Sequence, residues 1–110
     1  MADTAFVAIN FIRVTDEYRA RFEELFGSRA HAIDAMPGFR DMQVLRPTGD
    51  AEEYLVVSRW NSEGDFRAWT GSEAFLAGHR RAFADLAEAK ARGDQPPMHS
   101  DFRTYSVLCD

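Results

Sequence analysis

The segment from Phe6 to Val14 constrains the fold of this chain more than any other. β-Branched and aromatic residues dominate it, which is typical of a strand buried on both faces. Side chains alternate between the two faces of a strand. One face carries Phe6, Ala8, Asn10 and Ile12, and the other carries Val7, Ile9 and Phe11. The sheet that contains this strand therefore needs cover on both sides.

A helix and a hairpin are predicted after this strand. Thr15 and Asp16 are suitable caps for the helix, and Pro37-Gly38 is expected to end it. Its apolar residues recur at helical spacing and are Tyr18, Phe22, Leu25, Phe26 and Ile33. Two strands follow, from about Phe39 to Leu45 and from Tyr54 to Trp60, joined by the turn-rich segment Pro47-Thr48-Gly49-Asp50.

A second helical region is predicted in two pieces. Ser62 and Asp65 resemble a capping box that opens a short helix, and Gly71-Ser72 interrupts it and caps a second piece. The apolar and aromatic positions of the two pieces are Phe66, Trp69, Phe75, Leu76, His79, Phe83 and Leu86. A polar loop is expected from Gly93 to Ser100, and Phe102 to Cys109 alternates as a closing strand.

The resulting order is βαββαβ, which predicts an α+β ferredoxin-like fold with an antiparallel sheet. At 110 residues the chain is expected to form a single domain over residues 1–110. Helices cover only one face of such a sheet, so the other face needs a second cover. A homodimer in which the bare faces meet satisfies this need, and a monomer with an uneven apolar surface is the alternative.

Composition excludes some partners. The formal net charge of −5 offers no basic field for nucleic acid or an anionic membrane. The single cysteine, Cys109, has no partner for a disulfide within the chain, and Met1 to Thr4 is polar, so a cytoplasmic protein is expected. The sequence contains no glycine-rich phosphate loop, no Cys-x-x-Cys and no carboxylate cluster with metal spacing.

Three residues are candidates for chemistry, and each also has a structural interpretation. His79 lies four residues after Phe75 and four before Phe83, on the apolar face of its helix, as a ligand or as a hydrogen-bonded core histidine. Trp69 is equally consistent with ordinary core packing. Asn10 is a strand amide whose polar atoms are satisfied either by neighbours or by a ligand.

The chain resembles the IsdG-type heme-degrading monooxygenases, within the antibiotic biosynthesis monooxygenase (ABM) family of dimeric α+β barrel proteins. The strongest resemblance is the segment Ala68-Trp69-Thr70-Gly71-Ser72-Glu73-Ala74-Phe75-Leu76-Ala77-Gly78-His79-Arg80, which has the tryptophan-to-histidine spacing of the staphylococcal members. The segments Ser28 to Ile33, Pro37-Gly38-Phe39 and Gln43 to Pro47 are similar to the mycobacterial member.

This resemblance implies that heme is both cofactor and substrate, with dioxygen, an external electron donor and a reductase taking part. His79 would be the axial ligand of the heme iron, Trp69 would press the porphyrin out of plane, and Asn10 would hydrogen-bond the oxygen species. Further heme contacts are expected from Phe26, Arg29, Phe66, Phe75 and Phe83, each also consistent with ordinary core or, for Arg29, a solvated surface.

Three points stay open from the sequence. The Gly93 to Ser100 loop is a candidate lid, and His99 within it is a rival ligand. The same fold also suits a cofactor-independent oxygenase that acts on a quinol or a polyketide. A third interpretation is a non-enzymatic protein that binds heme without degrading it. Asn10 and Trp69 favour turnover over this interpretation, because heme storage needs neither residue.

Overall fold

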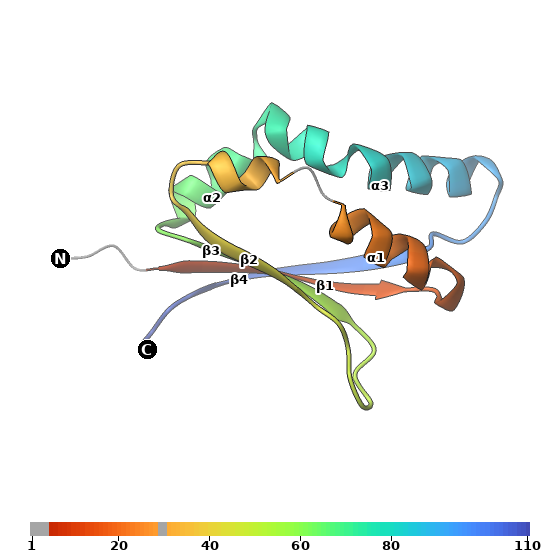
Figure 1. The fold of residues 1–110 in the computed structure, drawn as a ribbon, viewed down its shortest axis with the longest axis horizontal. Coiled ribbons are helices and arrows are strands. Elements are labelled where there is room, and N and C mark those ends of the chain that lie inside the picture. Colours follow the sequence, from red (N-terminus) through yellow and green to blue (C-terminus); the bar gives the residue numbers. More distant parts are fainter. Residues whose placement is uncertain (1–4, 29–30) are drawn as a thin grey trace.

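The helices pack on one face of an antiparallel sheet (Figure 1). The computed structural model describes residues 5–28 and 31–110. The strands are β1 (Phe6–Val14), β2 (Phe39–Leu45), β3 (Tyr54–Trp60) and β4 (Met98–Ser106). The α-helices are α1 (Arg19–Gly27), α2 (Glu63–Thr70) and α3 (Glu73–Ala91), and the 3-10 helices are η1 (Asp16–Tyr18) and η2 (Ala32–Ala35). This order confirms the predicted ferredoxin-like βαββαβ arrangement.

Strand β1 lies in the interior of the sheet, whose strand order is β2-β3-β1-β4. It pairs antiparallel with β3 on one side and with β4 on the other. On the side that the helices cover, Phe6, Ala8 and Ile12 are buried. The predicted alternation of β1 is therefore confirmed, and Asn10 shares this covered face.

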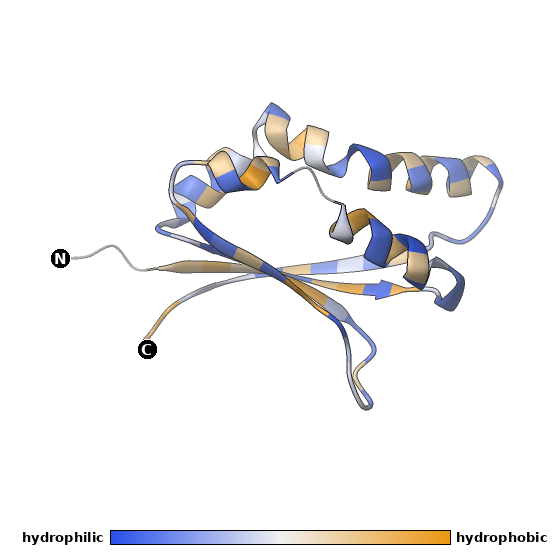
Figure 2. Ribbon diagram, viewed as in Figure 1, coloured by the Kyte–Doolittle hydropathy of each residue, from blue (hydrophilic) through white to orange (hydrophobic). Residues whose placement is uncertain are grey.

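The other face of the sheet has no helix over it (Figure 1). Val7, Ile9 and Phe11 lie on this face and are only partly buried. The hydropathy colouring shows that β1 is mostly hydrophobic, whereas hydrophilic residues recur along α3 (Figure 2). We call this surface the open sheet face.

The predicted caps of the second helical region are confirmed. The Ser62 hydroxyl oxygen accepts a hydrogen bond from the backbone N–H of Asp65 at 3.2 Å. Ser72 does the same for the N–H of Phe75 at 3.1 Å, so the chain turns between α2 and α3 and starts a new helix. Gly38, just before β2, has a φ of +79°, and a Cβ at this position would overlap the Asp65 side chain. Only glycine fits that turn without strain.

The first helix is shorter than predicted. It ends at Gly27 instead of continuing to Pro37-Gly38, and Ile33 belongs to the separate turn η2. The Ser28 hydroxyl donates to the Glu24 carbonyl at 2.7 Å, which competes with continuation of the helix. His31 then adopts a left-handed φ of 59°, which redirects the chain.

The last strand begins earlier and ends earlier than predicted. It runs from Met98 to Ser106 rather than from Phe102 to Cys109. Val14 and Ile12 of β1 pair with Met98 and Ser100, because β1 offers backbone partners along its whole length. Residues 98–100 of the candidate Gly93 to Ser100 lid are thus part of β4. Only the residues before Met98 form a loop between α3 and β4.

The core forms two clusters under the helices. One contains Phe6, Ala8, Ile33, Trp60, Phe66 and Trp69. The other contains Ile12, Phe22 and Tyr54. Asn10 lies between the two clusters along β1. Among the described residues, no helix has the length and apolar character needed to cross a membrane.

Candidate functional site

A cavity of about 620 Å³ lies between the sheet and the helices, where the two core clusters leave space. Its size falls in the range of small-molecule and cofactor pockets. Alternate residues of β1, β3 and β4 form its floor, and α1, η2, α2 and α3 contribute its walls. The floor residues include Ala8, Asn10, Ile12, Val56, Ser58, Met98, Ser100 and Phe102.

Asn10 is the polar group in the middle of this floor. Its direct neighbours across the sheet are Val56 on β3 and Phe102 on β4, whose side chains offer it no hydrogen bond. The side-chain oxygen Oδ1 is buried without a partner among the described residues. Because burial of an unpaired polar atom costs about 1–3 kcal/mol, this atom points to a role in binding.

His79 faces the same cavity from α3. Its Nδ1 lies 2.7 Å from the carbonyl oxygen of Phe75, one turn earlier in the helix. A carbonyl only accepts, so Nδ1 donates this hydrogen bond and Nε2 takes no part in it. The rings of Phe75 and Phe83 flank the imidazole, with centroids at 4.1 and 5.7 Å. The ring is therefore held in a fixed orientation at the cavity, with Nε2 outside its internal hydrogen bond.

Trp69 joins these two residues from α2. Its side chain is 7% exposed and belongs to the core, yet it also lines the cavity. Its ring meets Phe75 edge to face at 5.4 Å and lies 6.5 Å from the imidazole of His79, between ring centroids. The structure thus gathers Asn10, Trp69 and His79 around one cavity from three different elements.

The four predicted phenylalanines also line the cavity, namely Phe26, Phe66, Phe75 and Phe83. Phe66 is buried and stacks on Phe102 at a centroid distance of 5.6 Å. Phe83 is 46% exposed and stands at the rim. Arg29, the fifth predicted heme contact, lies outside the described residues.

The rival ligand His99 is in a different position. It is among the residues that line the cavity, yet it pairs with Arg13 in the β1–β4 register, so the alternation of β4 directs its side chain to the open sheet face. His31 lines the cavity, but its Nδ1 lies 3.1 Å from Asp34 Oδ2. Within residues 5–28 and 31–110, no group of three or more His, Cys, Asp or Glu side chains could hold a metal ion.

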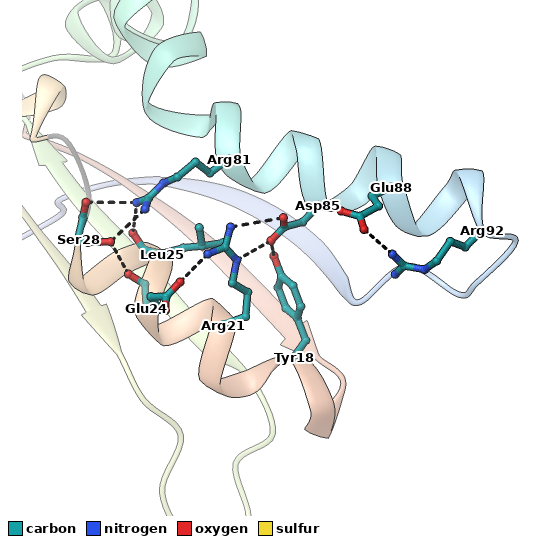
Figure 3. Close-up of polar contacts among 9 residues, drawn as sticks. All are labelled: Tyr18, Arg21, Glu24, Leu25, Ser28, Arg81, Asp85, Glu88 and Arg92. Carbon is teal, nitrogen blue, oxygen red and sulfur yellow. Dashed lines mark hydrogen bonds and ion pairs between the residues drawn. The ribbon is translucent and has the colours of Figure 1, made fainter.

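Sequence reasoning missed Arg81, which ties α3 to the end of α1 at the cavity wall (Figure 3). Its guanidinium donates to the backbone carbonyls of Leu25 at 3.1 Å and Ser28 at 3.2 Å. These contacts satisfy carbonyls at the C-terminal end of α1 and place a positive charge at the negative end of the helix. No local sequence pattern predicts these contacts, because Arg81 and Leu25 are 56 positions apart in the chain.

A second polar cluster joins α3 to the start of α1 and to the last residue of η1 (Figure 3). Asp85 accepts from the Tyr18 hydroxyl at 2.7 Å and from Nε of Arg21 at 2.9 Å. The hydrogen bond from Arg21 holds the pKa of Asp85 below its usual value. Burial, followed by the bond to Asp85, raises the pKa of Tyr18. We call these three residues the α1–α3 clamp.

Sequence reasoning also missed Phe102 and Ser58 on the floor. Phe102 lies opposite Asn10, and Ser58 lies opposite Ala8, so both depend on the register between strands. Ser58 is buried and accepts a hydrogen bond from the indole Nε1 of Trp60 at 3.0 Å. Alternation within one strand predicts which face a residue takes, but not which residue of another strand lies beside it.

The fold and the site define a small α+β domain that encloses one apolar ligand pocket with few polar groups. The family model for antibiotic biosynthesis monooxygenases matches residues 5–81. The chain therefore belongs to the antibiotic biosynthesis monooxygenase family.

Known proteins similar to this chain include heme-degrading members. A heme oxygenase (mycobilin-producing) from Mycobacterium tuberculosis is 42% identical over 76 residues, which span 67% of this chain and 72% of that protein. The structure of the M. tuberculosis heme-degrader MhuD with two hemes bound has a TM-score of 0.70 and 31% identity, covering 96% of this chain and 97% of that one.

A third similar structure supports the fold alone. The cofactor-independent oxygenase SnoaB from Streptomyces nogalater, as a mutant, has a TM-score of 0.71 and 20% identity. The alignment covers 99% of this chain and 97% of that chain. Because the fold is shared by proteins with different chemistry, the reaction must be argued from the site.

Proposed function

We propose that this protein is a heme-degrading monooxygenase that binds heme in the 620 Å³ cavity and opens the porphyrin oxidatively, releasing iron. The observation that carries the proposal is a pair of facing groups. An imidazole with a free Nε2 stands on the helix side, and an unpartnered amide stands on the sheet side. The similarity to heme-degrading relatives supports the same substrate.

The residues of the cavity fit a heme. A neutral imidazole is a good ligand for iron, and the bond from Nδ1 to the Phe75 carbonyl fixes which nitrogen is available. His79 would hold the heme iron from the helix side of the cavity. Phe26, Phe66, Phe75 and Phe83 supply an apolar lining that excludes water from the ring.

Each of the other two proposed residues has one task. Asn10 lies on the cavity floor, where its amide N–H groups would donate to a small oxygen ligand bound beside the heme. Trp69, which packs edge to face on Phe75, would press on the heme and strain it. When bound, heme supplies the iron that activates dioxygen and the carbon skeleton that is oxidised.

Three further parts of the proposal concern partners and place. Oxidation of heme with dioxygen needs electrons, so an external donor, such as a reductase, acts with this protein. The open sheet face is the surface on which two copies meet as a homodimer. The exposed thiol of Cys109 suits the reducing cytoplasm.

Titration of the purified protein with hemin tests the function. We expect a saturable Soret band, followed by its decay when ascorbate or a reductase is added in air. A Soret band that survives reduction in air would indicate heme binding without turnover. No Soret shift at all would overturn the proposal and favour a cofactor-independent oxygenase.

A further inference from the structure

Ser58 carries a buried hydroxyl that accepts a hydrogen bond but donates none to the described residues. Its side chain lines the cavity and the residue is 7% exposed. Nε1 of Trp60 donates to its oxygen at 3.0 Å, and an indole N–H cannot accept a hydrogen bond in return. The Ser58 proton therefore points elsewhere, and no acceptor for it lies within hydrogen-bond distance among the described residues.

Asn10 presents the complementary case. Its Oδ1 is a buried acceptor without a donor in the described part of the chain. Ser58 lies opposite Ala8, and Asn10 lies opposite Val56, so the two residues are diagonal neighbours on adjacent strands. Both side chains belong to the cavity floor. An unmatched donor thus stands beside an unmatched acceptor on one face.

The spacing between the two groups suits one water molecule. Diagonal neighbours in an antiparallel pair are about 7–8 Å apart, and Oδ1 of Asn10 makes no hydrogen bond to Ser58. Two consecutive O–H···O hydrogen bonds span about 5.5 Å, so one water can join oxygens on diagonal neighbours. A bridging water is held well when both of its neighbours are otherwise unsatisfied.

We propose that Ser58 is a positioning residue that holds Asn10 through one bound water, so that the amide nitrogen of Asn10 faces the cavity. The donors run in one direction, from Trp60 to Ser58, to the water and to Oδ1 of Asn10. Because the water accepts a hydrogen bond from Ser58, it has protons left to donate. These need an acceptor, so Oδ1 of Asn10 faces the water rather than Nδ2. This inference rests on the proposed function for its purpose, since a fixed Nδ2 serves a ligand in the cavity.

The first test uses the protein without heme. We expect a high-resolution crystal structure to show a water between Oγ of Ser58 and Oδ1 of Asn10. In NMR spectra, the side-chain amide of Asn10 should give sharp, exchange-protected signals in the wild type and in Ser58→Thr, which keeps the hydroxyl. In Ser58→Ala the same signals should broaden and lose protection. An empty position, or Asn10 signals unchanged in Ser58→Ala, would overturn the inference.

Ser58→Ala also removes the acceptor of Trp60, so lost stability must be separated from lost positioning. Tyr54→Phe is the matched control, because it deletes another buried hydroxyl on the same face of β3. We expect Tyr54→Phe to lower the thermal midpoint and leave the Asn10 signals unchanged. If Ser58→Ala does not fold, the wild-type water and Ser58→Thr still decide the question.

The second test uses the ferric heme complex and azide as the probe. We expect Ser58→Ala to weaken azide binding by about two- to tenfold, the loss of one modest hydrogen bond, while the dissociation constant for hemin stays unchanged. Asn10→Ala sets the upper limit of the effect, and Ser58→Thr should match the wild type. Azide affinity unchanged in Ser58→Ala would contradict the inference. If the wild type does not bind hemin, the proposed function fails, whereas the apoprotein test of Ser58 still stands.

Discussion

At the scale of the residue, the hydrogen bond from Nδ1 of His79 is the feature with the clearest chemical consequence. Its ring makes one hydrogen bond, to a carbonyl of its own helix, and this bond leaves Nε2 free. Because the imidazole lines the cavity, Nε2 is placed to meet a bound ligand. The single internal bond therefore favours the ligand interpretation over the structural one.

We expect His79→Ala to lose the Soret band of bound hemin while the protein stays folded, because the lost side-chain bond lies within one helix. Hemin titration and circular dichroism measure the two effects. His31→Ala is the matched control, since it removes an imidazole that lines the same cavity. A Soret band retained in His79→Ala and lost in His31→Ala would show that His31, and not His79, is the ligand.

The sequence predicts some site residues and misses others for a physical reason. The position of Asn10 on the covered face follows from the two-residue period of β1, and His79 follows from its spacing to Phe75 and Phe83. Their roles come from the family resemblance. Ser58 and Arg81 escape because cross-strand register and helix packing place them, and neither is written in a local pattern.

At the scale of the element, features set by local sequence agree with the structure better than features set by distant contacts. The bounds of β1, β2 and β3 and both serine caps agree with the structure, because alternation and capping are local effects. The wrong bounds lie where contacts with distant parts of the chain determine the end of an element. The first helix stops where Ser28 and Arg81 satisfy its last carbonyls, and β4 starts where β1 offers a partner.

The α1–α3 clamp makes a pH prediction. The Arg21 bond lowers the pKa of Asp85, so the charged carboxylate stabilises the fold above its ordinary pKa, and this contribution is lost as the pH falls through the folded-state value. The pKa of Tyr18 is raised, so its contribution is complete at neutral pH and is lost only in strong alkali. The clamp therefore stabilises the fold at neutral pH.

We expect Asp85→Asn to lower the free energy of unfolding by about 1–2 kcal/mol at pH 7, because the amide leaves Arg21 without its counter-charge. Urea unfolding at pH 7 and pH 3 measures the change, and the difference from wild type should shrink at pH 3. Glu88→Gln is the control, since Glu88 is one turn away and 70% exposed, so its pair with Arg92 should matter little (Figure 3). Equal effects of the two variants would contradict the assignment.

At the scale of the whole molecule, the open sheet face and the cavity lie on opposite sides of one sheet. Leu45 and Tyr105 on the open face are 43% and 45% exposed, and Val7, Ile9 and Phe11 continue the apolar surface. Arg59 pairs with Asp41 at 2.9 Å, and Arg103 pairs with Asp101 at 2.9 Å, so charges on this face are already matched within the chain. An apolar surface with internally paired charges is suited to a second copy of itself.

We expect Ile9→Lys to weaken self-association at least tenfold, measured by sedimentation equilibrium, because a charge is brought to the middle of the interface. The long lysine stem can keep its head in water, so each monomer stays folded. Leu108→Lys is the control, as Leu108 is 97% exposed beyond the end of β4. Because one chain supplies the floor and walls of the cavity, the Ile9→Lys monomer should bind hemin with wild-type affinity. Loss of hemin binding together with the dimer would mean that the second copy is needed to shape the site, and a wild-type monomer would remove the dimer from the proposal.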